Sequence, residues 1–314
     1  MPRMLPTLLA LTLLPTLALA QDVVPRRLAE GVQLLTGGPD GNVLVVDGEE
    51  SRLVVDGWSP ARVEPLLAAL ERLPGPPLRF VVNTHFHEDH RGLNTPLAAR
   101  GATLISHANT RASMSRGVFV QELGQSMHAA PAEALPTLVT SGDLTLHLGG
   151  RDVRLLHLPA AHTDGDLAVY IPDADVLLTG DVFELGAWPF LDVWHGGSLD
   201  GMLAACDRLA ALCGERTQVI PGHGPVSDLQ TLRAYREVLA GLLEKVAAAS
   251  VDVPDDEQGA QQRLSDFLGR APTAEWDQRW GGAAGGRRLA AIAWLGATGL
   301  WEPAAPVDED RPGG

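Results

Sequence analysis

A cluster of potential metal ligands directly after an apolar run is the feature that most constrains this chain. Residues 84–90 read Thr-His-Phe-His-Glu-Asp-His, which gives the pattern H-x-H-x-D-H. The preceding run, Leu78–Val82, is typical of a buried strand. A strand that ends in such a turn places imidazoles and a carboxylate at a sheet edge. Zinc takes these groups as ligands, and a catalytic zinc site leaves one position open for water. The run therefore predicts a metal centre at the end of a strand.

Three more candidate ligands repeat this arrangement further along the chain. His162, Asp181 and His223 each follow a short strand-like segment and lie in turns marked by Gly, Pro or Thr. Those segments are Val153–Leu158, Val176–Leu178 and Gln218–Ile220. In their order and local context, the four ligand sites resemble those of the metallo-β-lactamase superfamily, over a stretch from about Val32 to about Leu243.

Hydrophobic periodicity predicts two groups of strands, each accompanied by helices. Further strands are expected at 32–36, 42–46, 52–55, 103–106, 144–148 and 167–171, and helices from Pro60 onward and at 96–100, 199–212 and 229–248. Residues 110–137 are interpreted as helix and loop. Periodicity alone describes this as a mixture of α and β. The resemblance implies an α+β fold, a four-layer αββα sandwich with a short helical C-terminal extension.

The N-terminus carries the features of a secretory signal peptide over residues 1–20. Arg3 is followed by an apolar stretch, and Ala18-Leu19-Ala20 forms an A-x-A cleavage site before Gln21. An anchor that is never cleaved is the alternative. We expect an exported, periplasmic protein with a catalytic domain over residues 21–250.

Residues 251–314 are expected to form a linker and a helical extension with a disordered tail. The apolar stretch Leu289–Trp301 is too short to span a bilayer, so we expect a helix packed on the domain or on a second subunit. The tail after Glu302 is interpreted as disordered. The mature chain is therefore predicted to have no membrane span, and its oligomeric state is not predicted.

The negative net charge of the chain argues against nucleic acid as a partner. The chain has 24 basic and 39 acidic residues and a net charge of -15, with no basic cluster. Such a surface repels phosphate backbones, so we predict no nucleic-acid binding and a small-molecule substrate.

The resemblance assigns a role to each candidate ligand. It implies that one zinc is held by His85, His87 and His162, that a second is held by Asp89, His90 and His223, and that Asp181 bridges the two. It thus implies two Zn²⁺ per chain, with iron or manganese as alternative metals. Asp89 is also the predicted catalytic residue, since its free oxygen could orient the nucleophile or carry its proton.

Two predictions concern the residues around these ligands. Asp56 is the best candidate to accept a hydrogen bond from the outer N–H of a ligating imidazole, although a turn-forming role before Gly57 is the alternative. The aromatic loop at 188–197 is expected near the mouth of the site. Its Trp188, Trp194 and His195 are predicted to contact an apolar part of the substrate, with ordinary loop packing as the alternative.

The resemblance implies a di-zinc metallo-hydrolase in which a metal-bridging hydroxide attacks the carbonyl of an ester, thioester, lactone or amide. Asp181 stands where one β-lactamase subclass has Cys, which argues against a β-lactamase of that type. His87 stands where the oxygen-reducing relatives have Glu, which argues against that branch. Lactonases typically have a Tyr shortly after the bridging Asp. Here Val182 and Phe183 follow Asp181, which weakens a lactonase assignment. Three alternatives stay open: a class B-like β-lactamase, a mono-iron persulfide-dioxygenase-like oxidoreductase, and a non-catalytic metal-dependent binding protein.

Overall fold

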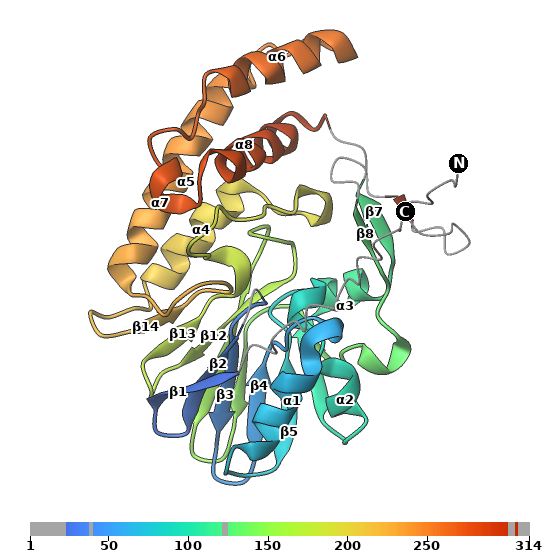
Figure 1. Ribbon diagram of the computed structural model, residues 1–314, viewed down its shortest axis with the longest axis vertical. Helices are drawn as coiled ribbons and strands as arrows, with labels where there is room; N and C mark the ends of the chain where they lie inside the picture. Colours follow the sequence, from blue (N-terminus) through green and yellow to red (C-terminus); the bar gives the residue numbers. More distant parts are fainter. Residues whose placement is uncertain (1–22, 38–39, 121–124, 301–304, 307–314) are drawn as a thin grey trace, which may run out of the picture.

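The computed structural model describes residues 23–37, 40–120, 125–300 and 305–306. The predicted signal peptide lies outside these residues. Two β-sheets face each other, and helices cover their outer surfaces (Figure 1).

The first half of the chain forms a seven-stranded sheet in the order β1-β2-β3-β4-β5-β6-β9. Strands β1 to β4 are antiparallel neighbours, whereas β4, β5, β6 and β9 run parallel. The strands are β1 (Val24–Ala29), β2 (Val32–Thr36), β3 (Val43–Asp47), β4 (Arg52–Val55), β5 (Leu78–Val82), β6 (Thr103–His107) and β9 (Leu138–Thr140). Helices α1 (Val63–Arg72), α2 (Asn94–Ala98) and α3 (Ala108–Met114) lie in the connections between the parallel strands. Parallel strands require such crossovers.

The second half forms a five-stranded sheet in the order β10-β11-β12-β13-β14. Its strands are β10 (Leu144–His147), β11 (Asp152–Leu158), β12 (Asp166–Ile171), β13 (Val176–Leu178) and β14 (Gln218–Ile220). The first four strands are antiparallel, and β14 joins β13 in parallel after helix α4 (Leu199–Ala210). Helix α5 (Leu229–Ala249) follows.

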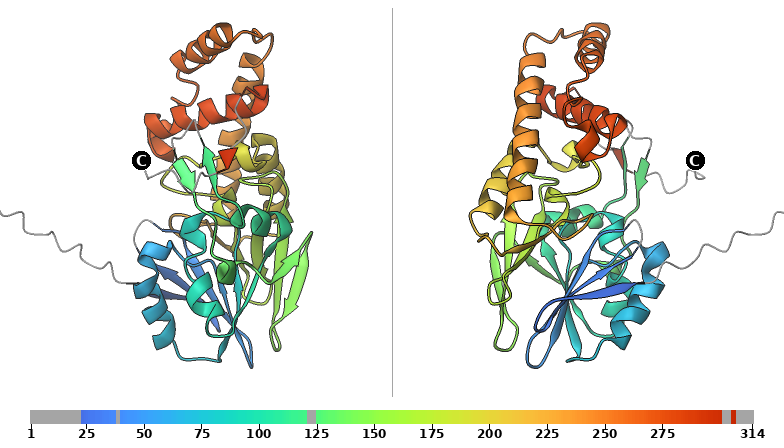
Figure 2. Two further views of the ribbon diagram at one scale, coloured as in Figure 1. Left: turned by 90° about the vertical axis from the view of Figure 1, so that its right-hand side faces the viewer. Right: turned by 60° about the vertical axis from the view of Figure 1, so that its left-hand side comes forward.

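Side chains along the strands of the first sheet point alternately into two hydrophobic cores, one on each face of the sheet. In β3, Leu44 and Val46 point into the core between the two sheets, whereas Val43 and Val45 point into a second core beneath α1. This is the two-residue period of a strand that is buried on both faces. The outer face of the second sheet packs on α4 and α5. Three cores thus separate four layers, and the predicted αββα sandwich is confirmed (Figure 2).

The C-terminal extension shares its core with the second half of the domain. It comprises α6 (Glu257–Gly269), α7 (Asp277–Trp280) and α8 (Ala283–Thr298). Leu289 and Trp294 of α8 are 0% and 1% exposed and belong to the same cluster as Leu239 of α5. The expected packing of this stretch on the domain is therefore observed for the part that lies in α8, up to Thr298, whereas residue 301 lies outside the described residues. Within the described part of the chain, no helix combines the length and the hydropathy that a bilayer crossing requires.

We expect Leu289→Ala to lower the free energy of unfolding by about 2–5 kcal/mol, because it leaves a cavity in this shared core. Leu300, just beyond α8, is 43% exposed, and Leu300→Ala should change stability by less than about 0.5 kcal/mol. Denaturant unfolding followed by far-UV circular dichroism would measure both. A separate early transition in Leu289→Ala, with the main transition unmoved, would contradict a shared core.

Five strands were not predicted. Residues 110–137 contain not only helix and loop but also β7 (Val118–Val120) and β8 (Gln125–Met127), and β1 and β9 were also missed. The expectation of disorder after Glu302 is wrong for β15 (Ala305–Pro306), which pairs with β7; the rest of the tail lies outside the described residues. Apart from β1, which has six residues, these strands have two or three residues, and a strand that short shows no recognisable alternation, so its partner decides its conformation.

Candidate metal centre

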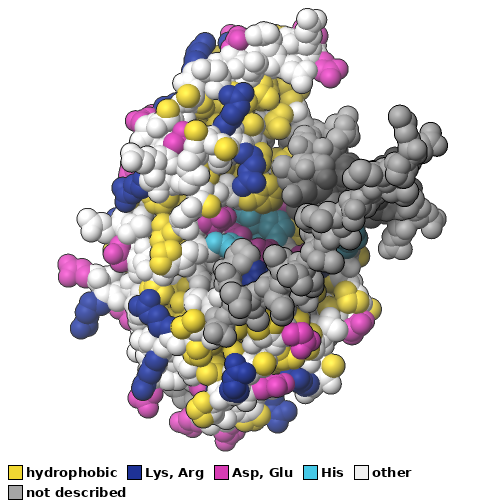
Figure 3. Space-filling model, viewed as in Figure 1, with side chains coloured by type: hydrophobic (Ala, Val, Ile, Leu, Met, Phe, Trp, Pro, Cys, Tyr) yellow, Lys and Arg dark blue, Asp and Glu magenta, His cyan; other side chains and the backbone are white. Residues whose placement is uncertain are grey.

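All seven predicted ligands lie in turns at one edge of the two sheets. The 85–90 run follows β5 of the first sheet, whereas His162, Asp181 and His223 follow β11, β13 and β14 of the second. These three strands of the second sheet run in the same direction, so their carboxyl ends share one edge. The four predicted strand-end motifs therefore converge. Figure 3 shows histidine and acidic side chains gathered in a hollow of the surface.

A first group of ligand atoms comprises His85, His87, His162 and Asp181, all of them buried. Nδ1 of His87 lies 3.0 Å from Nε2 of His85 and 3.0 Å from Nε2 of His162. The candidate ligand atoms of this group all lie within 4.8 Å of one another. Three imidazole nitrogens and a carboxylate oxygen at this spacing could hold one tetrahedral ion.

A second group comprises Asp89, His90 and His223. Nε2 of His223 lies 3.3 Å from both Nε2 of His90 and Oδ2 of Asp89. The Asp181 carboxylate lies between the groups, with Oδ1 3.3 Å from Nε2 of His90 and Oδ2 3.7 Å from Nε2 of His85. Asp181 is thus the one side chain of the cluster that is placed to contact ions in both groups.

Hydrogen bonds from the histidine rings to residues outside the ligand cluster determine which nitrogen of each ring faces the centre. His90 donates from Nδ1 to Oδ2 of Asp56 (2.9 Å), and His85 Nδ1 lies 3.0 Å from the hydroxyl of Thr84. Thr84 in turn donates to Asp56 from its backbone N–H and its hydroxyl, both at 2.8 Å. The prediction that Asp56 accepts from a ligating imidazole is confirmed. A fixed outer partner leaves the inner nitrogen free to coordinate a metal.

Two acids in the site were not predicted. Asp192 is 0% exposed, and its Oδ2 accepts from Nε2 of His87 (3.1 Å) and from Nδ1 of His195 (2.7 Å). Glu184 is 7% exposed and lies in the wall of the neighbouring cavity; burial and then repulsion from Asp181 raise its pKa to about 8. The sequence pattern that could have indicated these two residues is an acid between apolar neighbours, as in Leu191-Asp192-Val193. A buried acid in such a segment must be paired or neutral.

The donor set fits divalent metal ions. Oδ1 of Asp181 is buried without a hydrogen-bond partner, and the inner nitrogen of each of the five histidine rings lies 3.0–3.3 Å from that of another ring in its group. Buried polar atoms without partners are rare in folded proteins and indicate an ion or another bound group. Nitrogen and carboxylate oxygen together are the ligands that zinc prefers, and iron or manganese also accept them.

The pKa shifts of His85 and His162 agree with this assignment, because they keep these rings in the neutral form that binds a metal. Burial lowers the pKa of His162 to about 4, and burial likewise lowers the pKa of His85. Burial acts to lower the pKa of His223 as well, but Asp181 and Asp89 outweigh it and raise this pKa to about 11. Burial acts to raise the pKa of Asp181, yet His90 and His223 hold it well below its ordinary value. The carboxylates therefore require positive charge beside them, which bound cations would supply.

Gly222 and Asn42 hold the His223 turn against Asp181. A Cβ atom on Gly222 would stand 1.9 Å from Oδ1 of Asp181, so only glycine permits this approach. The Asn42 side chain donates to the carbonyls of Pro221 (2.8 Å) and Gly224 (2.9 Å) from across the sandwich. The second sheet thereby positions its ligands with help from the loop before β3.

A cavity of about 560 Å³ opens beside the ligands. Its wall combines Phe190 and Leu185 with Glu88 and with several of the candidate metal ligands. Trp188 and Trp194 are 2% and 7% exposed and belong to the hydrophobic core, so their placement argues against the predicted substrate contact.

His195 does not line this cavity either. Its ring packs on Phe86 with the centroids 4.5 Å apart, and Nδ1 donates to Asp192. Side chains along this loop point to opposite sides, which places Phe190, rather than the two tryptophans or His195, in the cavity wall.

We expect Asp56→Asn to weaken zinc binding about 10- to 100-fold, because the amide brings no negative charge and cannot accept all three hydrogen bonds. Asp175→Asn is a matched control: both aspartates have positive φ (63° and 51°) and accept from a threonine hydroxyl, but Asp175 pairs with Thr217 away from the site. Competition with a chromogenic chelator would measure both affinities. Wild-type affinity in Asp56→Asn would contradict the role of this carboxylate.

Comparison with known proteins agrees with this site. The family model described as the metallo-beta-lactamase superfamily matches residues 36–227. The chain belongs to this superfamily. It is 30% identical to a hydroxyacylglutathione hydrolase of Synechococcus over 233 residues, which cover 70% of this chain and 78% of the relative. It is 32% identical over 166 residues to a hydroxyacylglutathione hydrolase of Methylococcus capsulatus, covering 52% of this chain and 55% of the relative.

A solved structure shows the same fold. A metallo-beta-lactamase from Pontibacter korlensis aligns with a TM-score of 0.57 at 20% identity, covering 70% of this chain and 99% of that one. The family match ends at residue 227, so it does not include the extension helices α6 to α8. The protein is thus a metallo-hydrolase of the metallo-β-lactamase superfamily with a potential metal-binding His/Asp site.

Proposed function

We propose that this superfamily member is a di-zinc hydrolase that cleaves a carbonyl compound, with thioesters as the preferred class among esters, thioesters, lactones and amides. The observation that carries the proposal is the pair of adjoining ligand groups with Asp181 between them. His85, His87 and His162 would hold one ion, and Asp89, His90 and His223 the other. When bound, the ions would supply an activated water at neutral pH and a Lewis acid for the carbonyl oxygen.

Asp89 is the residue placed to move a proton. Its side chain is 38% exposed and lies in the cavity wall, whereas Asp181 is 7% exposed at the side chain. His90 and His223 outweigh burial and lower the pKa of Asp89, so it is ionised at neutral pH and can accept a proton from water. It can then return that proton to the leaving group. A thiolate is a better leaving group than an amine, so cleavage of a thioester depends less on proton transfer to the leaving group than cleavage of an amide does.

The apolar part of the cavity supports a substrate with a hydrophobic acyl portion. Phe190, Leu185 and Ala187 line the cavity together with the candidate ligands. Two relatives, at 30% and 32% identity, are named hydroxyacylglutathione hydrolases, and that name describes hydrolysis of a thioester.

We also propose that residues 1–20 direct export to the periplasm, which fractionation of expressing cells would test.

The experiment is a parallel assay of the zinc-loaded full chain on a thioester, a lactone and a chromogenic cephalosporin, with metal content measured on the same sample. Two zinc ions per chain and turnover of the thioester or lactone would support the proposal. Cephalosporin turnover on the order of 10⁴ M⁻¹s⁻¹ or more would instead assign a β-lactamase. One iron per chain with oxygen consumption would assign the persulfide-dioxygenase-like reaction.

A further inference from the structure

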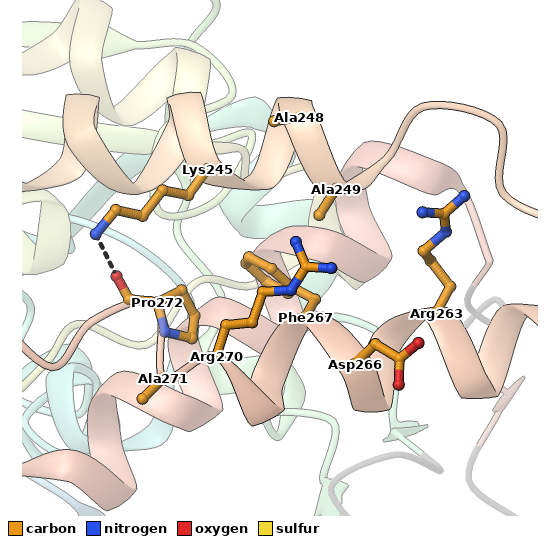
Figure 4. A pocket seen from close by; sticks show the side chains of 9 residues that line it. All are labelled: Lys245, Ala248, Ala249, Arg263, Asp266, Phe267, Arg270, Ala271 and Pro272. Atoms are coloured by element: carbon orange, nitrogen blue, oxygen red, sulfur yellow. Dashed lines mark hydrogen bonds between the residues drawn. The ribbon is translucent and has the colours of Figure 1, made fainter.

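A second cavity lies within the C-terminal extension, away from the metal ligands. It has a volume of about 350 Å³ and lies between the last turns of α5 and helix α6. Its floor is Phe267, which is 5% exposed, and α5 contributes the small side chains of Ala248 and Ala249 beside the longer side chain of Lys245. This size falls in the range of pockets that take small organic ligands, roughly 300–1,000 Å³. The close-up in Figure 4 shows the aromatic ring between the two helices.

Three cations surround this apolar floor. Lys245 projects from α5 and Arg263 from α6, and Arg270 directly follows the last residue of α6, with its guanidinium reaching across Phe267 towards α5 (Figure 4). The lining contains one acid, Asp266, whose carboxylate accepts from the side chain of Gln262. The whole chain has 39 acidic and 24 basic residues, so this cavity reverses the charge balance of the protein.

The two guanidinium groups are available to an anion. No carboxylate among the residues that the structure describes pairs with either Arg263 or Arg270, and Arg263 donates one hydrogen bond, to the carbonyl of Asp252 at 3.2 Å. Lys245, the only lysine of the chain, donates to the carbonyl of Pro272 at 2.7 Å and pairs with Glu275. Lys245 is thus held at the end of the cavity by its own partners, whereas the two guanidinium groups have no carboxylate partner among the described residues.

We propose that this cavity binds an amphipathic organic anion, with an apolar chain on Phe267 and the two alanines and a carboxylate on Arg270 and Arg263. Guanidinium groups bind carboxylates through two parallel hydrogen bonds, which gives the head group its selectivity. The apolar chain gains affinity from leaving water, at about 0.8 kcal/mol for each buried methylene. Both halves of the ligand are needed, because a free arginine pair on an open surface binds small anions weakly.

The test is a calorimetric titration of the zinc-loaded full chain with octanoate, 1-octanol and acetate. We expect saturable octanoate binding below about 1 mM, and at least about tenfold weaker binding of acetate, which lacks the chain, and of octanol, which lacks the charge. Absence of saturable octanoate binding overturns the proposal. Binding to vesicles of phosphatidylglycerol with no response to dissolved octanoate also overturns it, since it would indicate a membrane surface instead.

Paired variants locate the bound octanoate. Arg270→Gln should weaken it about tenfold or more, whereas Arg79→Gln, at an exposed arginine on β5, should not change it. Ala248→Leu should fill the cavity and prevent binding, whereas Ala247→Leu, at an exposed neighbour outside the lining, should leave binding intact. An octanoate response that a chelator removes and that Arg270→Gln leaves unchanged would place the carboxylate at the metal centre and overturn the proposal.

Discussion

Asp181→Asn is expected to remove hydrolytic activity and a large part of the bound metal together. The amide has the shape of the carboxylate but no charge, and it cannot serve two cations at once. Oδ1 of Asp181 now lies 3.3 Å from Nε2 of His90, and Oδ2 lies 3.5 Å from Nε2 of His223. Without this charge the two metal groups lose their common ligand, and we expect kcat/KM to fall on the order of 10³-fold or more.

Metal content and activity of this variant should be measured on the same purified sample. Asp200→Asn provides a control, since Asp200 is an exposed acid in the first turn of α4, away from the ligands. Circular dichroism would show that the variant is folded. An Asp181→Asn protein that keeps two ions per chain and near-normal rates would refute a shared ligand at this position.

Asp89→Asn should separate catalysis from metal binding. Its side chain is the most exposed of the three carboxylates around the second group, at 38% against 7% for Asp181 and 2% for Asp56. His90, His223 and Asp181 remain to hold the ion, so most metal should stay bound. Because the amide cannot accept a proton, kcat should fall about 10²- to 10⁴-fold with a smaller change in KM.

The comparison between these two variants distinguishes their roles. A loss of activity that follows metal content in Asp89→Asn, as in Asp181→Asn, would make Asp89 a structural ligand only. Near-normal kcat in a metal-loaded Asp89→Asn would remove it from the reaction altogether. Rates should be measured at saturating zinc, so that weaker binding is not mistaken for slower chemistry.

The metal centre was predictable because its residues repeat one local event. In each case a short apolar strand ends and a ligand follows in a Gly-, Pro- or Thr-marked turn, and the boundaries predicted for β5, β13 and β14 agree with the structure. The same local information indicated Asp56, which follows β4 directly and accepts from His90. These features depend on the order of residues within a strand and its turn.

Features that depend on contacts between distant segments could not be derived in this way. Asp192 pairs with His87 across 105 positions of sequence, and β15 forms only where β7 offers an edge. Trp188 and Trp194 looked like substrate contacts because they are aromatic and close to Asp181, but α8 and its neighbours enclose them in a core.

Local sequence by itself thus determined the strand ends and their seven candidate ligands, because strand periodicity and turn chemistry act over a few residues, whereas the αββα sandwich was expected from the resemblance to the superfamily. Only the tertiary structure decided which side chains line the cavity, which acids orient the ligands and how the extension joins the core. The physical reason is that burial of a side chain is set by what packs against it, and that partner lies far away in sequence.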